Sequence, residues 1–447
     1  MKKVQSGALF LMLLAFAACT STPEGSDLNS RISELGKTSF DAQQAPSDPS
    51  PSILQNPRLI VKFAVEKSDD VRAAKEAWSA ASGRIEAEKA NLAPRLTSGL
   101  TLGGSRELRS GASSDTVGAS TGLYLDKVLF DGGTIRSRVG SAEIDAFIAE
   151  QAYRRSIIET TSKFLKLQNS YVINTRRLEL LREFQDKGQS LYEKIERLTN
   201  QGIIDKSVLI AADVELKKLQ LGQATIEGEI AAARVQLEQF TINPVKTGAH
   251  ILDPLASVSI SRLKGDIKTN PDILTSASRV LLAENDIALI KSQKSAKINL
   301  KSSLTTSQDT SSNPDLSVGV QMNWTLNDGG KTTLDLLSAE DRLKSAQNSY
   351  SAAQKFSTST FDTLSQKLQD IEKISALIVS QADALSKKME FEEDQLQTGY
   401  KNISELINSN KELYDLKDEV LQLENDRLSI NIDLSGMTGH LIAWAGF

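Results

Sequence analysis

The sequence predicts a mainly α-helical fold with a small β part, built from two copies of one structural unit. Three observations support this prediction. One offset of 197 residues, the spacing between Asp131 and Asp328, aligns a long span of the chain with a later one. Residues 95–243 and 315–447 contain no proline, the residue that most reliably interrupts helices. Stretches of alternating apolar and polar residues precede each long helical pattern, as β-hairpins would.

The duplicated span runs from Asp131 to Thr241 and keeps a single offset throughout. Neither copy contains a net insertion, and this equal length indicates elements that must stay in register, as long helices lying side by side do. Matching pairs at this offset include Ser141 with Ser338, Tyr153 with Tyr350, Phe164 with Phe361, Leu209 with Leu406 and Leu237 with Leu434.

The composition favours long helices over several globular domains. The chain has 447 residues, of which 40% are hydrophobic and only 5% aromatic. Several globular domains would need more aromatic residues to fill their hydrophobic cores. The same composition is ordinary for long helices rich in Ala, Leu, Gln and Lys. The net charge is -5 and no basic block stands out, so the sequence gives no reason to expect nucleic acid as a partner.

Residues 1–18 are predicted to be an export signal. Lys2 and Lys3 precede an apolar run, residues 8–16, that is too short to span a membrane. The signal ends in two alanines followed by Cys19.

Cys19 is the only cysteine, and its position after small residues resembles the lipidated cysteine of bacterial lipoproteins. Phe16 stands where such signals usually have leucine. The alternative is a chance cysteine in a discarded peptide. Residues 19–52, rich in Ser, Pro, Gly and Asp, are predicted to form a flexible lipidated tether.

The first repeat is predicted to begin with a helix. Asn56-Pro57 opens a pattern of apolar residues at helical spacing, and Asn270-Pro271 is interpreted as the equivalent start in the second copy. Proline is favourable in the first turn of a helix, because its missing N–H would have no partner there. The offset in this part is 202, the spacing between Val71 and Ile273.

A β-hairpin is predicted in each copy, at about 95–130 and 297–327. Apolar residues alternate with Thr, Ser, Gly, Gln and Asn, so each hairpin has one apolar face. The first hairpin is interpreted with a Gly- and Ser-rich turn from Gly103 to Asp115. The offset falls from 202 to 197 across this segment, so the first hairpin is five residues longer, as an exposed loop would tolerate.

Each hairpin ends in an aspartate and two glycines, which are predicted to join the last strand to the next helix. An aspartate can cap that helix, and glycine adopts backbone angles that other residues avoid. The pattern is not a phosphate-binding loop, because the GxxxxGKS and GxxxxGKT motifs are absent. The joint residues are Asp131, Gly132, Gly133, Asp328, Gly329 and Gly330.

Two very long helices are predicted, at about 134–200 and 331–397. About 67 helical residues at about 1.5 Å each would extend for roughly 100 Å. No compact domain of this size is that long, so the chain is expected to build an elongated object. Gly202 and Gly399 mark the turns at which these helices end.

Return helices are predicted after the two glycines, at about 204–242 and 402–438. Their apolar residues recur in two columns with a mean spacing of about 3.5 residues, which indicates a coiled-coil seam and leaves the other faces polar. Arg427 interrupts one column of the second copy. The columns of that copy are Leu406, Leu413, Val420 and Leu434, and Leu416, Leu423, Ile430 and Met437.

The predicted organisation is a first repeat at 53–242, a linker at 243–269 and a second repeat at 270–440. The linker contains two prolines and is interpreted as a short packing segment on the outside. In each repeat the order is helix, amphipathic hairpin, very long helix, glycine turn and returning heptad helix.

This duplicated order, together with the signal peptide, resembles the TolC-like outer-membrane efflux and secretion channels, the outer membrane factors. The resemblance covers about residues 55–440. It is carried by Leu129-Phe130-Asp131-Gly132-Gly133 with its second copy, by the Asn-Pro helix start, and by Gly202 and Gly399 with a leucine seven residues after each.

The resemblance implies a homotrimer in which four strands from each chain close a twelve-stranded transmembrane barrel. Below the barrel, the long helices would form a coiled-coil barrel across the periplasm of a Gram-negative bacterium. Two physical arguments agree with this. Four strands cannot shield their edges in lipid, so a barrel has to close by association, and a single apolar face suits lipid outside and water inside.

The function that the resemblance implies is a passive exit channel for a tripartite efflux pump or a type I secretion system. Its partners would be a periplasmic adaptor protein and, through it, an inner-membrane pump or ABC transporter. Small molecules and secreted protein both fit as cargo. The alternative is a periplasmic coiled-coil adaptor or scaffold, which would lack two amphipathic hairpins that each lead into so long a helix.

The resemblance also implies a gate and an adaptor-docking surface at the periplasmic tip, near Gly202 and Gly399. Three Glu405 carboxylates around a three-fold axis could bind cations or be gated by charge pairing. Asn408 stands where the family often has a second acidic residue. The alternative is that these are exposed charges at helix starts. The candidate gate residues are Asp205, Lys401, Glu405 and Asn408.

Catalysis and cofactor binding find no support in the sequence. The two histidines, His250 and His440, have no Cys or His neighbour at metal-ligand spacing. No GxSxG or HExxH motif occurs. We therefore expect neither an enzyme nor a bound metal or cofactor.

Overall fold

The structure is a computed structural model that describes residues 57–109, 112–240, 251–256, 258–307, 314–397 and 403–447. All of them belong to one of the chain's two units, Pro49–Phe447. The predicted export signal, Cys19 and most of the tether belong to the other unit and lie outside the described residues. His250, Gly399 and Lys401 also lie outside the described residues, although they belong to the same unit as those residues.

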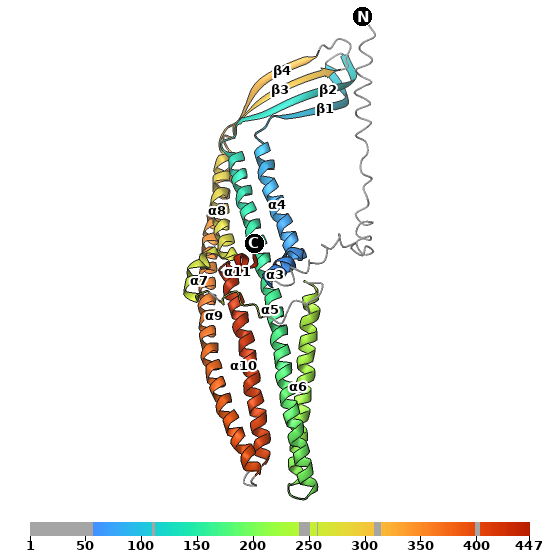
Figure 1. Ribbon diagram of the computed structural model, residues 1–447. Coiled ribbons are helices and arrows are strands. Elements are labelled where there is room, and N and C mark those ends of the chain that lie inside the picture. Colours follow the sequence, from blue (N-terminus) through green and yellow to red (C-terminus); the bar gives the residue numbers. More distant parts are fainter. Residues whose placement is uncertain (1–56, 110–111, 241–250, 257, 308–313, 398–402) are drawn as a thin grey trace. The chain divides into compact units, whose positions relative to one another are not determined.

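The predicted mainly helical fold with a small β part is confirmed (Figure 1). The first copy consists of α3 Pro57–Lys67, α4 Asp69–Ala90, β1 Arg95–Arg109, β2 Ala112–Phe130, α5 Thr134–Asn200 and α6 Lys206–Glu238. The later elements are α7 Ile260–Asp266, the 3-10 helix η3 Ile267–Thr269, α8 Pro271–Ser292, β3 Lys297–Ser307, β4 Asp315–Asn323, α9 Lys331–Gln397, α10 Ile403–Met437 and α11 His440–Ala445.

The helix boundaries reproduce both offsets of the repeat. Helices α5 and α9 each have 67 residues, and they begin 197 residues apart. Helices α4 and α8 each have 22 residues, and they begin 202 residues apart. Among the described helices, none has the length and hydropathy that crossing a membrane requires.

The interpretation of two equivalent Asn-Pro helix starts is wrong. At the offset of 202, the capping residue Asn270 of α8 corresponds to Ser68, which precedes α4. Pro57 opens a separate helix, α3, whose equivalent is α7 with η3. The predicted linker therefore contains a repeated element. The apolar pattern hid this break, because α3 and α4 are separated by a single residue.

The Gly- and Ser-rich turn predicted from Gly103 to Asp115 is also wrong. Strand β1 continues to Arg109 and β2 begins at Ala112, with Gly103 paired to Gly118. The hydrogen bonds of a β-ladder join main-chain groups and do not depend on the side chain. A stretch rich in glycine and serine can therefore remain a strand when a partner strand supplies those bonds. The longer first hairpin therefore has longer strands instead of a longer loop.

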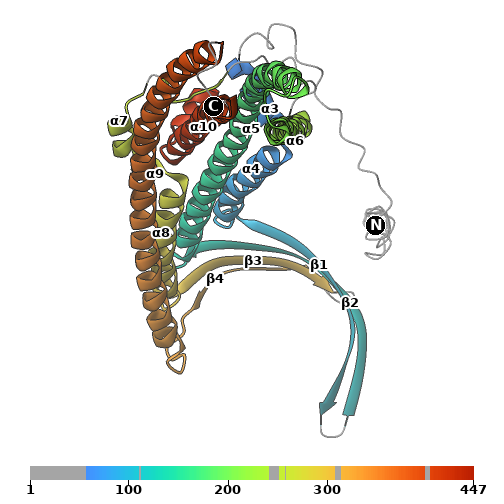
Figure 2. The same cartoon turned by 90° about the horizontal axis from the view of Figure 1, so that it is seen from below.

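The four strands form one antiparallel sheet in the order β1-β2-β3-β4 (Figure 2). Pairing between β2 and β3 joins the two copies, and a register shift occurs between Val128 and Phe130. Strands β1 and β4 are the edges, and neither has a second partner among the described strands. A lone four-stranded sheet thus presents two rows of main-chain groups for pairing.

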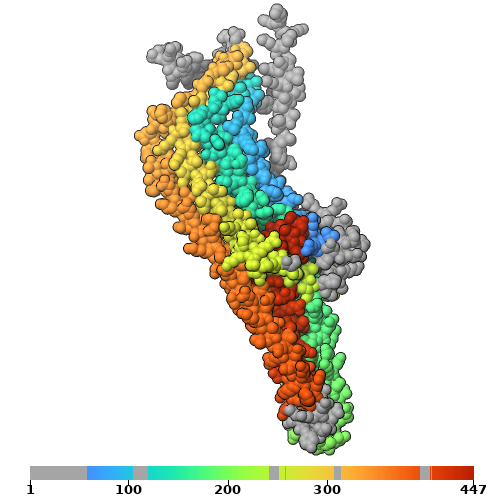
Figure 3. Space-filling view, turned by 60° about the vertical axis from the view of Figure 1, so that its left-hand side comes forward, coloured from blue at the N-terminus to red at the C-terminus, as the bar shows by residue number. Residues whose placement is uncertain are grey.

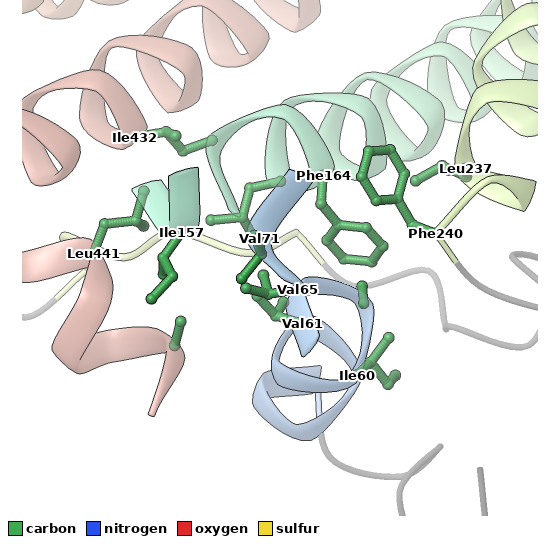
Figure 4. Packing of buried hydrophobic residues seen from close by; sticks show 13 residues of the cluster. Ile60, Val61, Val65, Val71, Ile157, Phe164, Leu237, Phe240, Ile432 and Leu441 are labelled. Atoms are coloured by element: carbon green, nitrogen blue, oxygen red, sulfur yellow. The ribbon is translucent and has the colours of Figure 1, made fainter. Parts of the chain in front are cut away.

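The helices alternate between the copies. Helix α5 contacts α4 and α8 along one part of its length, and α6 and α10 along the other. Helix α9 contacts α8 and α10, and the space-filling view shows it lying along the surface (Figure 3). The largest buried cluster lies where α3, α5, α10 and α11 meet, and Phe164 packs edge-on against Phe240 there (Figure 4).

The chain between the copies is fastened to this region by side chains. Asn169 of α5 is 1% exposed, and its amide donates to the C=O of Leu252 at 2.9 Å and accepts from its N–H at 2.8 Å. Asp253 accepts from Asn431 at 3.0 Å and lies 3.5 Å from the Arg427 guanidinium. The contact with this segment therefore explains why a charged residue, Arg427, stands in an otherwise apolar heptad column.

Replacing Asn169 with leucine should release this segment. Asn169→Leu leaves the N–H and C=O of Leu252 without partners, and an unpaired buried group costs about 1–3 kcal/mol. We expect a lower Tm and new proteolytic cleavage within residues 251–256. Gln189→Leu, an exposed polar-to-apolar change on the same helix, is the control. Equal cleavage in both variants would show that Asn169 does not hold the segment.

Candidate functional site

One face of the sheet is apolar across all four strands. Residues directly opposite in a ladder point to the same face, and the register pairs Leu96 with Leu125, Leu123 with Leu304, and Leu300 with Val320. The apolar side chains Leu96, Leu100, Leu102, Leu123, Leu304, Leu316, Val318, Val320 and Met322 are exposed in the isolated chain.

The opposite face of the sheet is polar. Thr97 pairs with Tyr124, Tyr124 pairs with Ser303, and Ser303 pairs with Ser317. The hydroxyl groups of Ser303 and Ser317 lie 2.7 Å apart. A sheet with one apolar and one polar face can separate hydrocarbon from water, provided that its edges are paired.

The two joints hold the helices to the sheet through their aspartates. Asp131 accepts from the N–H of Gly133 at 2.9 Å and from the N–H of Ile135 at 2.5 Å. Gly132 and Gly133 have φ values of 68° and 91°, which favour glycine. Gly132 is also confined, because a Cβ there would lie 2.1 Å from the Cβ of Ser295.

The second joint repeats this geometry. Asp328 accepts from the N–H of Gly330 at 3.0 Å and from the N–H of Thr332 at 2.9 Å. Hydrogen bonds from the Thr332 hydroxyl and main chain lower the pKa of Asp328 to about 2, so it stays ionised at neutral pH. Gly329 is not confined in this way, because a Cβ there would have no neighbouring atom within 4 Å.

Gly202 ends α5 in a Schellman motif. Its N–H donates to Thr199 O at 2.9 Å, and the N–H of Ile203 donates to Leu198 O at 3.0 Å. Gly202 has a φ of 73°, which the motif requires. Asp205 then caps α6 by accepting from the N–H of Ser207 at 2.7 Å. Hydrogen bonds from the Ser207 hydroxyl and main chain lower the pKa of Asp205.

The candidate gate residues are only partly brought together. The start of α10 packs against the α5–α6 turn, since Ile403 and Ile407 share an apolar cluster with Ile195 and Ala212. Glu405 and Asn408 are exposed on this part of α10, whereas Leu406 is buried. Glu405 thus projects beside the apolar seam and not into it. Lys401 and Gly399 lie outside the described residues.

An ionic cluster on α5 and α10 escaped the sequence analysis. The Arg177 guanidinium donates to Asp418 at 2.7 and 2.9 Å, to Asn174 at 3.1 Å and to Glu229 at 3.4 Å. The hydrogen bond to Asp418 is the main cause that raises the pKa of Arg177. Arg177 therefore connects three helices, α5, α6 and α10.

A signal for this cluster is present in the repeat. At the offset of 197, Arg177 corresponds to Ile374, and Asp418 corresponds to Leu221. The contact between α5 and α10 therefore has two opposite charges at positions where the other copy of the repeat has two apolar residues. Because single charges on long polar helices are common, only the three-dimensional contact separates this pair from solvated residues.

No metal site is formed by the described residues, which contain no group of three or more His, Cys, Asp or Glu placed to hold an ion. His440 begins the short helix α11. Its neighbour Leu441 belongs to the apolar cluster around Phe164.

Removing one member of the ionic cluster should destabilise the contact between α5 and α10. In Arg177→Ile, the nearly buried Asp418 loses its main partner. Breaking a buried ion pair in this way lowers the free energy of unfolding by about 3 kcal/mol. We expect Arg177→Ile/Asp418→Leu, which installs the residues of the other copy, to recover most of the loss. Chemical unfolding in detergent would measure this.

Arg182→Ile is the matched control, because Arg182 is exposed and lies 3.5 Å from the exposed Glu227. Equal unfolding midpoints for Arg177→Ile and Arg182→Ile would contradict a structural role of the buried pair.

Comparisons with known proteins agree with this geometry. The outer membrane efflux protein family model matches residues 60–241 and 267–440. No curated protein sequence matches the chain.

Several solved structures share the fold. The outer membrane protein VceC from Vibrio cholerae has a TM-score of 0.76 at 15% identity, covering 86% of this chain and 96% of its own. The CmeC channel from Campylobacter jejuni has a TM-score of 0.73 at 13% identity and covers 91% of each chain. The open MtrE channel from Neisseria gonorrhoeae has a TM-score of 0.70 at 16% identity, covering 86% and 88%.

The matched residues include both copies of the repeat, both hairpins and both joints. The chain therefore belongs to the outer membrane efflux protein family, whose members are transport channels of the Gram-negative outer membrane and not enzymes.

Proposed function

We propose that this protein is the exit duct of a tripartite efflux pump or a type I secretion system, assembled as a homotrimer. It is a passive conduit, and an inner-membrane pump or ABC transporter supplies the energy. A periplasmic adaptor protein connects the two. Membership of the outer membrane efflux protein family supports this proposal.

The observation that carries the proposal is the single apolar face of a sheet with two open edges. In lipid every main-chain N–H and C=O needs a partner within the protein. Strand β4 of one chain and β1 of the next can supply these bonds to each other. Three chains then close the twelve-stranded barrel, with its apolar face toward lipid and its polar face toward water.

The tip of the helices is proposed as the gate and docking surface. Gly202 lies in a tight turn and is exposed, which suits contact with an adaptor protein. Glu405 is exposed in the first turn of α10 and projects beside the buried Leu406. We propose that three such carboxylates face the pore axis.

We propose Cys19, the first residue of the tether, as the lipid anchor.

Trimer formation and conduction can be measured on the detergent-extracted protein. We expect a particle with the mass of three chains that inserts into planar bilayers and conducts ions. A monodisperse monomer that keeps its helicity without detergent would contradict the proposal.

Glu405→Ala should reduce the cation preference of the pore and weaken block by divalent cations, because it removes three carboxylates from one level. Glu238→Ala is the control, since it removes an exposed carboxylate at the far end of α6. Selectivity and block unchanged by Glu405→Ala in an intact trimer would place Glu405 outside the pore.

Deleting the protein from its native cell tests the cargo. Accumulation of small toxic compounds with an unchanged set of secreted proteins would indicate an efflux pump. Loss of a secreted protein with unchanged drug sensitivity would indicate type I secretion.

A further inference from the structure

A small apolar cavity lies between α5, α6 and α10, the three helices that run side by side in the lower part of Figure 1. Its volume is about 130 Å³. Leu181 of α5, Ala212 of α6 and Ile407 of α10 line it and are 0%, 5% and 8% exposed. Helices from both copies of the repeat therefore enclose this cavity, and none of the candidate gate residues lines it.

Two glycines leave the cavity open. Gly188 lies within α5 and Gly222 within α6, and both line the cavity. Glycine inside a helix lowers helix stability relative to alanine. A Cβ on Gly222 would lie 3.9 Å from the Leu181 Cδ2, which is an ordinary contact. Gly222 therefore lowers helix stability at a place that has room for a side chain.

The second copy of the repeat fills the place that is open in the first. At the offset of 197, Gly188 corresponds to Leu385 of α9. Leu385 is 7% exposed and belongs to an apolar cluster between α9 and α10. Its partners there include Ile378, Leu413 and Leu416, the equivalents of Leu181, Leu216 and Leu219. The first copy thus keeps apolar surroundings of this kind but lacks the side chain that occupies them in the second.

The charged side chains around the cavity are paired with one another. Lys218 lies 2.7 Å from Glu215 on α6, and Lys411 donates a hydrogen bond to Asp415 on α10. That hydrogen bond is the main cause that raises the pKa of Lys411, and the charge of Glu215 acts in the same direction. The two acidic and two basic side chains of the lining cancel. An ionic ligand would therefore meet no net charge here, and burying an unpaired charge is unfavourable.

The lining also offers two uncharged polar side chains, Asn410 and Tyr414 of α10. Burial is the main cause that raises the pKa of Tyr414 to about 12, so its hydroxyl stays protonated at neutral pH. An amide and a neutral hydroxyl can each donate or accept a hydrogen bond. These two groups suit a neutral ligand that carries a single polar atom.

The volume of the cavity suits one aromatic ring. An apolar cavity of about 150 Å³ lined by Leu, Ile and Phe stays dry in water and binds benzene. The Tyr414 ring at the wall, which packs against Phe184 with their centroids 5.6 Å apart, adds an aromatic surface. Pairs of aromatic rings gain free energy beyond the area that they bury. A flat ring is therefore favoured over an aliphatic group of the same size.

We propose that this cavity binds a small uncharged aromatic molecule that carries one hydroxyl or N–H group and has the size of phenol. The ring occupies the place that Leu385 fills in the second copy, and its polar atom bonds to Asn410 or Tyr414. Because the lining comes from α5, α6 and α10, the bound molecule ties the α5–α6 hairpin to α10. The whole lining belongs to one chain, so this binding does not depend on the proposed assembly.

Binding of para-fluorophenol to the full-length, detergent-extracted protein tests the site. Fluorine NMR measures the bound fraction, and detergent takes up the probe equally in every variant. We expect saturable binding of one molecule per chain, and displacement of the probe by phenol. Benzoate and benzylamine are of similar size but charged at neutral pH. They should displace the probe poorly, because the cavity would have to bury an unpaired charge.

Gly188→Leu should abolish saturable binding, because it installs the side chain of the second copy. A Cβ on Gly188 would lie 3.1 Å from the Leu216 Cδ2, the end of a flexible side chain that can shift. Gly228→Leu is the matched control. It makes the same change within α6, where a Cβ would have no neighbouring atom within 4 Å, and it should bind the probe as the wild type does.

A milder variant decides the question if Gly188→Leu does not fold. Gly222→Ala should weaken binding, because its methyl group narrows the cavity beside Leu181, although alanine stabilises the helix. Gly228→Ala, which stabilises the same helix away from the cavity, should leave binding unchanged. Binding by Gly222→Ala equal to that of the wild type would overturn the site.

Thermal unfolding gives a second measurement. A ligand that binds the folded state stabilises it, so phenol should raise the Tm of the wild type and of Gly228→Leu but not that of Gly188→Leu. Absence of saturable binding in the wild type, or equal saturable binding in a folded Gly188→Leu, would overturn the inference. Displacement by benzoate as effective as that by phenol would overturn the assigned chemistry of the ligand.

Discussion

The packing of α5 against α8 and α10 is the contact on which the rest of this structure depends. It brings the long helix of the first copy against two helices of the second, from Thr134, whose hydroxyl lies 2.9 Å from that of Ser292, to Ile195, which shares a cluster with Ile403. Helices α5 and α9 are of equal length, and each begins at a joint, where Asp131 or Asp328 connects helix to sheet. Strands β2 and β3 can then pair, which makes one sheet from two hairpins.

This dependence explains why the repeat tolerates no insertion in its helices. An added residue in α5 would rotate every later side chain by about 100° around the axis, since a helix has about 3.6 residues per turn. The buried residues Phe164, Leu181 and Ile195 would then leave their clusters. The hairpins, whose ladders extend without such a penalty, differ in length between the copies.

The two copies of the repeat place different kinds of residue at equivalent positions of their helices. The contact inside the chain is polar, with Arg177 and Asp418 nearly buried and Asn285 hydrogen bonded to Ser137. A nearly buried ion pair adds little net stability but fixes a geometry, because both charges must be paired where they lie. The equivalent residues on the open edges are apolar, and apolar contacts contribute through the area that they remove from water. The interior of the chain therefore relies on paired polar groups, whereas its open edges present apolar surface.

Local sequence determined much of this protein. Proline-free spans, heptad columns and alternating strands depend on neighbours along the chain, so they predicted α5, α9 and both hairpins close to their observed bounds. The aspartates at the joints and Gly202 at its turn were also predicted, because capping and positive φ involve only a few adjacent residues. The break at Ser68 and the length of β1 were not, since the first lies inside a continuous apolar pattern and the second is fixed by pairing with β2.

Tertiary structure alone decided which charges matter. Arg177 and Asp418 are 241 positions apart in the chain, and nothing near either residue indicates the other. The same applies to Asn169, whose role depends on Leu252 lying against α5. Tertiary structure also decided that α9 is left uncovered while its equivalent α5 is enclosed. A repeat makes the two helices alike in sequence pattern, but only packing in space determines how many neighbours each one has.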